Sequence, residues 1–194
     1  MKNHCLLIFL LLNFSSPSSV KAQKIIKIPT QPLMVFRVGI GGHQLLGNSP
    51  LGGNISFNCE DRVGKHLSWT ANFVAMMNPI DLSLPPDVRG SYQTRLIIQP
   101  DFRYYPTEAL HHFYIGGGLG IVGGHEKITG ISPYGKSQLH IFCEALTDIK
   151  IGWQGSLFDR YVWNAFTASG LLLPLNGEKT LPILRFGIQL GLVK

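Results

Sequence analysis

The chain has 194 residues, a formal net charge of +6 and only 14% charged residues, whereas an average soluble domain has roughly 25%. Its basic residues are scattered rather than gathered in one patch, which argues against a nucleic-acid-binding protein. A chain with so few charged residues has little polar surface to expose to water. This shortage argues against an ordinary soluble enzyme core.

The N-terminus has the layout of a secretory signal peptide. Lys2 precedes an apolar run from Cys5 to Phe14, and a Ser-rich stretch leads to Ala22, where cleavage is expected. The alternative is a retained anchor, but the apolar run is shorter than the roughly 20 residues that span a bilayer as a helix. We therefore expect a signal peptide at 1–22, a short periplasmic segment at 23–31 and one domain at 32–194.

The rest of the chain alternates between apolar and polar side chains, which is the period of a β-strand. In the last segment, Leu184, Phe186 and Ile188 share one face, while Arg185 and Gln189 share the other. The pattern predicts eight strands, at 33–43, 52–60, 66–77, 92–104, 112–123, 138–152, 160–171 and 182–193. Most of them are long enough to cross a bilayer at a tilt.

The connecting segments alternate in length. Segments 61–65, 105–111 and 153–159 are expected on the periplasmic side, and the longer segments 44–51, 78–91, 124–137 and 172–181 outside. Short inner turns and longer outer loops are typical of outer-membrane barrels. The sequence therefore predicts an all-β fold, an eight-stranded antiparallel transmembrane β-barrel.

The same alternation fits a soluble, lipocalin-like barrel with its apolar face inward. Two features favour the membrane orientation. The polar face is rich in glycine, as at Gly39, Gly118 and Gly187, which suits a crowded interior. The apolar face carries aromatic residues near one rim, which indicates an interfacial girdle. The predicted girdle residues are Trp69, Phe102, Tyr104, Phe113, Trp153, Tyr161 and Trp163.

If the apolar face meets lipid, the charged residues must face the lumen. These residues are Arg37, Glu60, Arg95, Asp101, Arg103, Glu144, Asp148, Lys150 and Arg185. An eight-stranded barrel is only wide enough for side chains to fill, so we expect this lumen charge network to pair into a structural plug. A gated ion path is the alternative.

Three other patterns suggest chemistry but lack the context that it needs. Residues 130–137 match the phosphate-loop pattern, yet no buried strand precedes them. His43, His125 and His140 could approach one another to hold a metal, although their spacing gives no tight ligand set. His140 and Glu144 could serve a hydrolase if Ser137 lay within reach. We expect no catalytic, cofactor-binding or metal-binding residues.

The segment from Leu96 to Pro106 and the segment from Phe113 to Gly120 resemble small outer-membrane β-barrel proteins of the Bacteroidetes. The layout of the whole mature chain is similar to OmpX and to the transmembrane domain of OmpA. This resemblance implies Sec-type export, insertion into the outer membrane by the barrel-assembly machinery, and contact with outer-membrane lipids. It implies a structural, adhesive or minor pore role and supplies no catalytic residues.

The function expected from the sequence is therefore a non-enzymatic outer-membrane barrel that acts in envelope integrity or binds an extracellular ligand through its outer loops. Two other classes stay open. One is a lipid-modifying outer-membrane enzyme, and the other is a soluble periplasmic ligand-binding barrel.

Overall fold

The computed structural model describes residues 34–46, 51–79, 92–107, 112–128, 138–157, 160–175 and 179–194. The expected signal peptide at 1–22 and periplasmic segment at 23–31 lie outside the described residues. No helix within the described ranges is long and apolar enough to cross a membrane.

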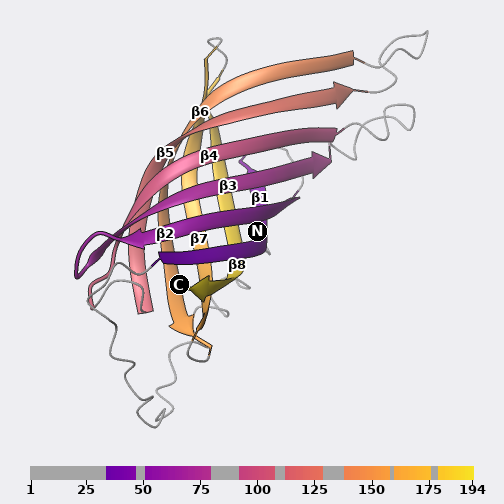
Figure 1. Ribbon diagram of the computed structural model, residues 1–194. Helices are drawn as coiled ribbons and strands as arrows, with labels where there is room; N and C mark the ends of the chain where they lie inside the picture. The colour runs from indigo at the N-terminus through magenta and orange to yellow at the C-terminus, as the bar shows by residue number, and fades with distance from the viewer. Residues whose placement is uncertain are drawn as a thin grey trace, which may run out of the picture.

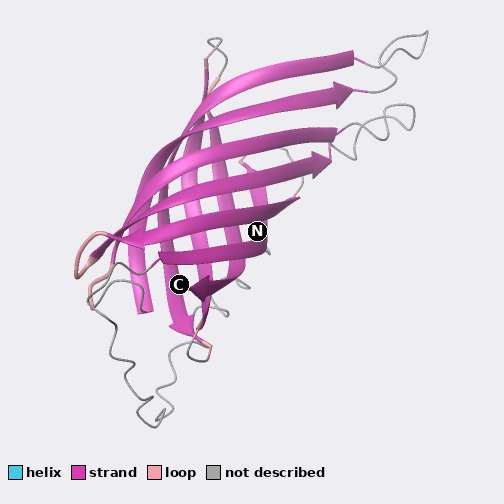
Figure 2. Ribbon diagram, viewed as in Figure 1, coloured by secondary structure: helices cyan, strands magenta, loops and turns pink. Residues whose placement is uncertain are grey.

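Eight antiparallel strands form one closed barrel in sequence order (Figures 1 and 2). The strands are β1 (Met34–Leu45), β2 (Gly52–Arg62), β3 (Leu67–Pro79), β4 (Tyr92–Tyr104), β5 (His112–Ile128), β6 (Gln138–Ser156), β7 (Tyr161–Pro174) and β8 (Leu181–Val193). Strand β1 pairs with β2 on one side and with β8 on the other, so the first and last strands close the wall. This result confirms the predicted fold class.

All eight strands lie where the alternation predicts them, with ends that differ by a few residues. The largest difference is in the β5–β6 hairpin, because β5 continues to Ile128 and β6 to Ser156. The polar sequence His125–Lys127 was expected to belong to a loop, but its residues pair in register with β6. Polar residues interrupt the apolar pattern there without ending the strand.

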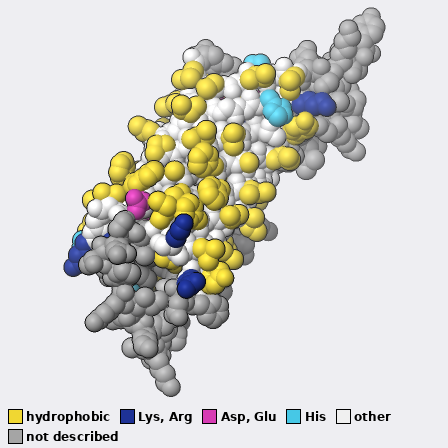
Figure 3. Space-filling model, viewed as in Figure 1, with side chains coloured by type: hydrophobic (Ala, Val, Ile, Leu, Met, Phe, Trp, Pro, Cys, Tyr) yellow, Lys and Arg dark blue, Asp and Glu magenta, His cyan; other side chains and the backbone are white. Residues whose placement is uncertain are grey.

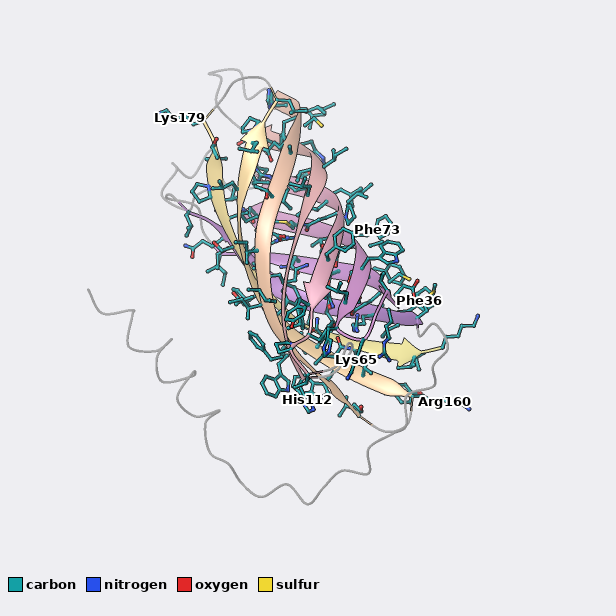
Figure 4. The ribbon with its side chains drawn as sticks, turned by 90° about the vertical axis from the view of Figure 1, so that its left-hand side faces the viewer. Phe36, Lys65, Phe73, His112, Arg160 and Lys179 are labelled. Atoms are coloured by element: carbon teal, nitrogen blue, oxygen red, sulfur yellow. The ribbon has the colours of Figure 1, made fainter. Side chains whose placement is uncertain are left out.

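The exposure of alternate side chains gives the orientation of the barrel. On β1, the side chains of Val38 and Ile40 are 58% and 72% exposed, while that of Arg37, on the opposite face of the same strand, is fully buried. Figure 3 shows hydrophobic side chains over most of the flank, with Lys and Arg toward the ends. In Figure 4, Phe36 and Phe73 point away from the barrel axis. The soluble alternative requires the reverse arrangement.

Glycines on the inner face relieve crowding between strands. A side chain at Gly118 would place its Cβ 2.2 Å from the carbonyl oxygen of Pro100, and one at Gly41 would lie 2.0 Å from that of Phe186. Both distances are far below a van der Waals contact, so the close approach of the backbones requires glycine there.

The barrel has two distinct ends. Lys65, His112 and Arg160 lie at the end that carries the short β2–β3, β4–β5 and β6–β7 connections, and Lys179 lies at the opposite end (Figure 4). We refer to the first as the inner end and to the second as the outer end.

Candidate functional site

The lumen is the candidate functional site, because every ionisable residue predicted for it points inside. The nine side chains of the lumen charge network have relative exposures between 0% and 5%. Five are cationic and four anionic, so they nearly neutralise one another. Buried charges are tolerated only when they are paired and hydrogen-bonded, and each of the nine has an oppositely charged partner in the lumen.

Glu60 on β2 is the centre of the network near the inner end. Its Oε2 atom lies 2.6 Å from Nη1 of Arg37 and 2.8 Å from Nη1 of Arg103. Its Oε1 atom accepts hydrogen bonds from the hydroxyls of Tyr105, at 2.6 Å, and of Ser68. One carboxylate therefore links β1, β2, β3 and β4.

Arg37 extends these contacts across the lumen. Its Nη2 atom donates to Oε1 of Gln154 on β6 at 2.7 Å, and its Nη1 atom donates to Oδ1 of Asn58 at 3.2 Å. The amide of Asn58 in turn donates to Oε1 of Gln189 on β8 at 2.7 Å, and that oxygen also accepts from Asn164 at 2.8 Å. Neutral amides thus extend the hydrogen-bond network from β1 and β2 to β6, β7 and β8.

Two further carboxylates hold the middle of the lumen. Lys150 donates to Oδ2 of Asp101 at 2.6 Å. Asp148 pairs with Arg185 and also accepts from Nε2 of Gln99 at 2.7 Å. Because Arg185 donates to Oε1 of Gln99 at 2.9 Å, β4, β6 and β8 meet at one set of side chains.

A separate pair lies nearer the outer end. Nε of Arg95 lies 3.1 Å from Oε2 of Glu144, and its guanidinium lies 4.8 Å from the centre of the Phe142 ring. The guanidinium of Arg95 is therefore held between the Glu144 carboxylate and the face of the Phe142 ring.

Apolar side chains bound the lumen on both sides of the charges that surround Glu60, Asp101 and Asp148. A small inner cluster contains Val35, Tyr105, Tyr114 and Val162. A larger outer cluster draws side chains from β1 and from β3 to β8. Its members are Leu45, Val74, Met76, Ile97, Val122, Leu146, Leu172 and Ile183. Charges paired with each other and bounded by apolar layers form a filled interior rather than an aqueous path.

The sequence did not reveal the outer cluster or the amides that bridge the charges. One signal was available, because runs such as Leu96-Ile97-Ile98 are apolar at three successive positions. An apolar residue between two lipid-facing residues must face inward. Alternation placed amides such as Gln189 on the inward face, but nothing in the sequence indicated which side chains they would bridge.

The predicted aromatic girdle residues lie on the outside of the barrel toward its inner end. Trp69 pairs with Phe102, and Phe113 pairs with Trp153. Tyr104 and Tyr161 are about half exposed. Trp163 differs, because it is half-buried and its ring lies over Gly155 on β6.

Among the described residues, the structure does not bring the residues of the other candidate sites together. His43 lies in the interior, whereas the His125 ring bonds to Thr94 on the outer wall. The described residues contain no group of three or more His, Cys, Asp or Glu that could hold a metal. The whole phosphate-loop match at 130–137, including Ser137, lies outside those residues. His140 and Glu144 are four residues apart along β6, or about 13 Å at roughly 3.3 Å per residue.

Solved structures share this fold. Ail, the attachment invasion locus protein of Yersinia pestis, matches with a TM-score of 0.61 and 8% identity, over 84% of this chain and 99% of Ail. Ail has also been solved in complex with the heparin analogue sucrose octasulfate. Neisserial surface protein A matches with a TM-score of 0.50 and 7% identity, over 83% of this chain and 96% of that protein. No protein-family model and no curated protein matches the sequence.

Ail and neisserial surface protein A are small, non-enzymatic outer-membrane barrels of eight strands. The present chain has the fold of this class, with an apolar outer wall and a filled ionic lumen. At such low identity, the likeness establishes the fold alone.

Proposed function

We propose that this protein is an integral outer-membrane barrel that anchors a protruding β-sheet edge at the outer surface of the membrane, where the edge binds other proteins by strand addition. The apolar outer wall around a buried ionic lumen is the observation that carries the proposal of membrane insertion. Hydrocarbon can solvate the wall, and the closed ladder satisfies the backbone groups without water.

The protruding edge is formed by β6. Its pairing with β7 begins at Glu144 and Pro174, while its pairing with β5 extends to Gln138. Among the described residues, no strand pairs with the β7-facing side of residues 138–142. At roughly 3.3 Å per residue, this edge continues for about 20 Å beyond the last β7 pair (Figure 1).

The backbone groups available on this edge can be identified. The carbonyl of Cys143 accepts a bond from the amide of Leu175, so it points toward the β7 side. In an antiparallel strand, residues two positions apart point their N–H and C=O groups to the same side. Leu139 and Ile141 therefore present theirs on the open edge, and their side chains are 63% and 76% exposed. Such an edge is a template for an added strand.

Membrane insertion is tested by carbonate extraction of cell envelopes and by gel migration of unheated and heated protein. The expected result is retention in the carbonate pellet and faster migration before heating, because a closed barrel resists detergent. Release by carbonate without detergent would overturn the proposal of integral insertion.

Strand addition is tested by chemical crosslinking to proteins applied outside intact cells, followed by comparison of two variants. Ile141→Pro removes an open-edge N–H without disturbing a bond to β5, whereas Ile141→Ala keeps the backbone donor. Loss of crosslinked partners with Ile141→Pro and their retention with Ile141→Ala is expected. Equal crosslinking by the two variants would exclude strand addition at this edge.

A lipid-modifying enzyme is the weaker candidate. Glu144 is engaged by Arg95, and His140 lies about 13 Å away at roughly 3.3 Å per residue. A catalytic base and its orienting carboxylate need to be within hydrogen-bond reach. Unchanged envelope lipid composition in cells that carry His140→Ala is the expected result.

A further inference from the structure

The outer wall contains a shallow groove of about 790 Å³ across β1 to β5, near the outer end. Small residues form its floor. Gly53 and Gly123 face outward, and a side chain built at either would meet nothing within 4 Å. Ala75 lies between them on β3, paired with Ile55 and Leu96. The groove exists because Gly53, Ala75 and Gly123 have at most a methyl side chain, whereas the neighbouring outward positions carry Ile, Leu or Met.

A polar cluster lies at one edge of this groove. Thr94 Oγ1 is 2.9 Å from Nδ1 of His125, and the ring of Tyr92 meets the His125 ring edge-on at 5.9 Å between centroids. Lys127 pairs with Tyr92 in the β4–β5 ladder and shares the outward face of β5 with His125. Glu126 falls on the opposite face. Figure 3 shows His and basic side chains beside each other near this end of the barrel.

The cluster lies at the height where the outer lipid headgroups are expected. Tyr104 belongs to the aromatic girdle, and Thr94 lies ten residues before it on β4. Ten residues at roughly 3.3 Å each and a tilt of about 40° rise about 25 Å, the height of the apolar band of an outer-membrane barrel. Polar groups on the lipid-facing wall are therefore positioned at the interface, and the groove below them lies within hydrocarbon.

From this arrangement we infer that the groove binds one phosphorylated lipid of the outer leaflet, with an acyl chain over Gly53, Ala75 and Gly123 and its phosphate at Lys127. Lys127 supplies the positive charge, while Tyr92, Thr94 and His125 supply hydrogen-bonding groups. Among the described lining residues no carboxylate opposes them. The inference rests on the proposed membrane insertion and names a specific lipid contact of that barrel.

A second groove provides an internal comparison. It is larger, about 1170 Å³, and crosses the opposite wall over β5 to β8 and β1. Its described lining includes Phe113, Trp153 and Phe186 and contains no Lys, Arg or His. Bulk lipid can fill this groove, but its lining gives no selection for a phosphate.

The test is native mass spectrometry of the folded protein in neutral detergent, titrated with bisphosphorylated lipid A, with the same lipid after removal of its phosphates, and with inorganic phosphate. We expect one lipid A to bind about tenfold more tightly than the dephosphorylated form, since one charge-assisted contact is worth about a factor of ten. Inorganic phosphate should neither bind nor compete, because it has no acyl chain.

Variants separate the two parts of the site. Lys127→Gln combined with His125→Gln should remove the preference for phosphate, and Gly123→Leu should weaken both lipids about tenfold by filling the groove floor. Lys179→Gln, at the same end of the barrel, and Ala165→Leu, in the second groove, should bind as the unaltered protein does.

The inference would be overturned by equal affinity for the two lipids or by unchanged binding to the altered variants. Competition by inorganic phosphate, or binding of a second protein copy in place of lipid, would also overturn it. Heat-modifiable gel migration is measured first on every variant. A failure to form a barrel contradicts the proposed function, whereas an intact barrel without lipid selectivity contradicts only this inference.

Discussion

The ring of Phe186 on β8 lies over Gly42 on β1, at the seam where the barrel wall closes. The two residues are directly opposite in the ladder, and a Cβ at Gly42 would lie 2.5 Å from Cζ of Phe186. An aromatic ring that covers a glycine on the neighbouring strand shields the exposed backbone and fixes the register. The same arrangement occurs at Trp163 over Gly155.

This seam contact predicts coupling between the two positions. Phe186→Ala should lower the free energy of unfolding by up to about 1 kcal/mol, the upper range for a cross-strand pair. Gly42→Ala should destabilise the barrel when Phe186 is present and have little effect when Phe186 is replaced by Ala. Urea unfolding in lipid vesicles of the four proteins of this double-mutant cycle measures the coupling. Strictly additive effects would contradict it.

The contacts of Glu60 predict that its charge is needed for stability. Glu60→Gln leaves the guanidinium of Arg37 buried without a counter-charge and leaves Arg103 with only its longer, 3.9 Å contact to Asp101, which should cost about 3–5 kcal/mol. The measurement is the free energy of unfolding in vesicles. Asp61→Asn is the matched control, because the neighbouring carboxylate points to the other face of β2 and should change stability little. A small effect of Glu60→Gln would show that water or ions enter the lumen.

The lipid-facing orientation of the outer wall predicts that the free-energy cost of a charged residue there depends on its depth in the bilayer. Leu119 is 71% exposed and lies midway along the outward face of β5, between Phe113 and His125. Leu119→Arg should therefore destabilise the inserted barrel by about 2–4 kcal/mol, as expected near the bilayer midplane. Val63→Arg, in the short β2–β3 turn outside the hydrocarbon, should have almost no effect. Comparable costs at both sites would contradict a membrane-facing wall.

The filled lumen predicts that the barrel does not conduct. Planar-bilayer recordings of the purified protein should show no discrete current steps, because the outer apolar cluster fills the lumen between the Arg95–Glu144 pair and the charges nearer the inner end. A large porin added afterwards to the same bilayer serves as the control that currents can be detected. Reproducible steps from the present protein alone would revive the gated ion path.

The sequence predicted the barrel because strand alternation records directly which side chains meet lipid. Strand positions, orientation and the inward placement of charges such as Arg185 all depend on that period of two. The extended β5–β6 hairpin was not predicted, because the alternation at His125 and Lys127 becomes polar once the strand leaves the hydrocarbon. The pairing partners in the lumen, such as Arg37 with Gln154 on β6, depend on barrel closure and leave no trace in local sequence.

The contacts of Glu60 and Arg37 have a consequence for biogenesis. Their partners come from β1, β2, β3, β4 and β6, so an open, half-finished sheet would expose bare charges to lipid. In such an intermediate these charges lack their partners, and they gain them only when the barrel closes. The polar interior therefore makes an incomplete barrel costly in lipid and favours all-or-none closure of the wall.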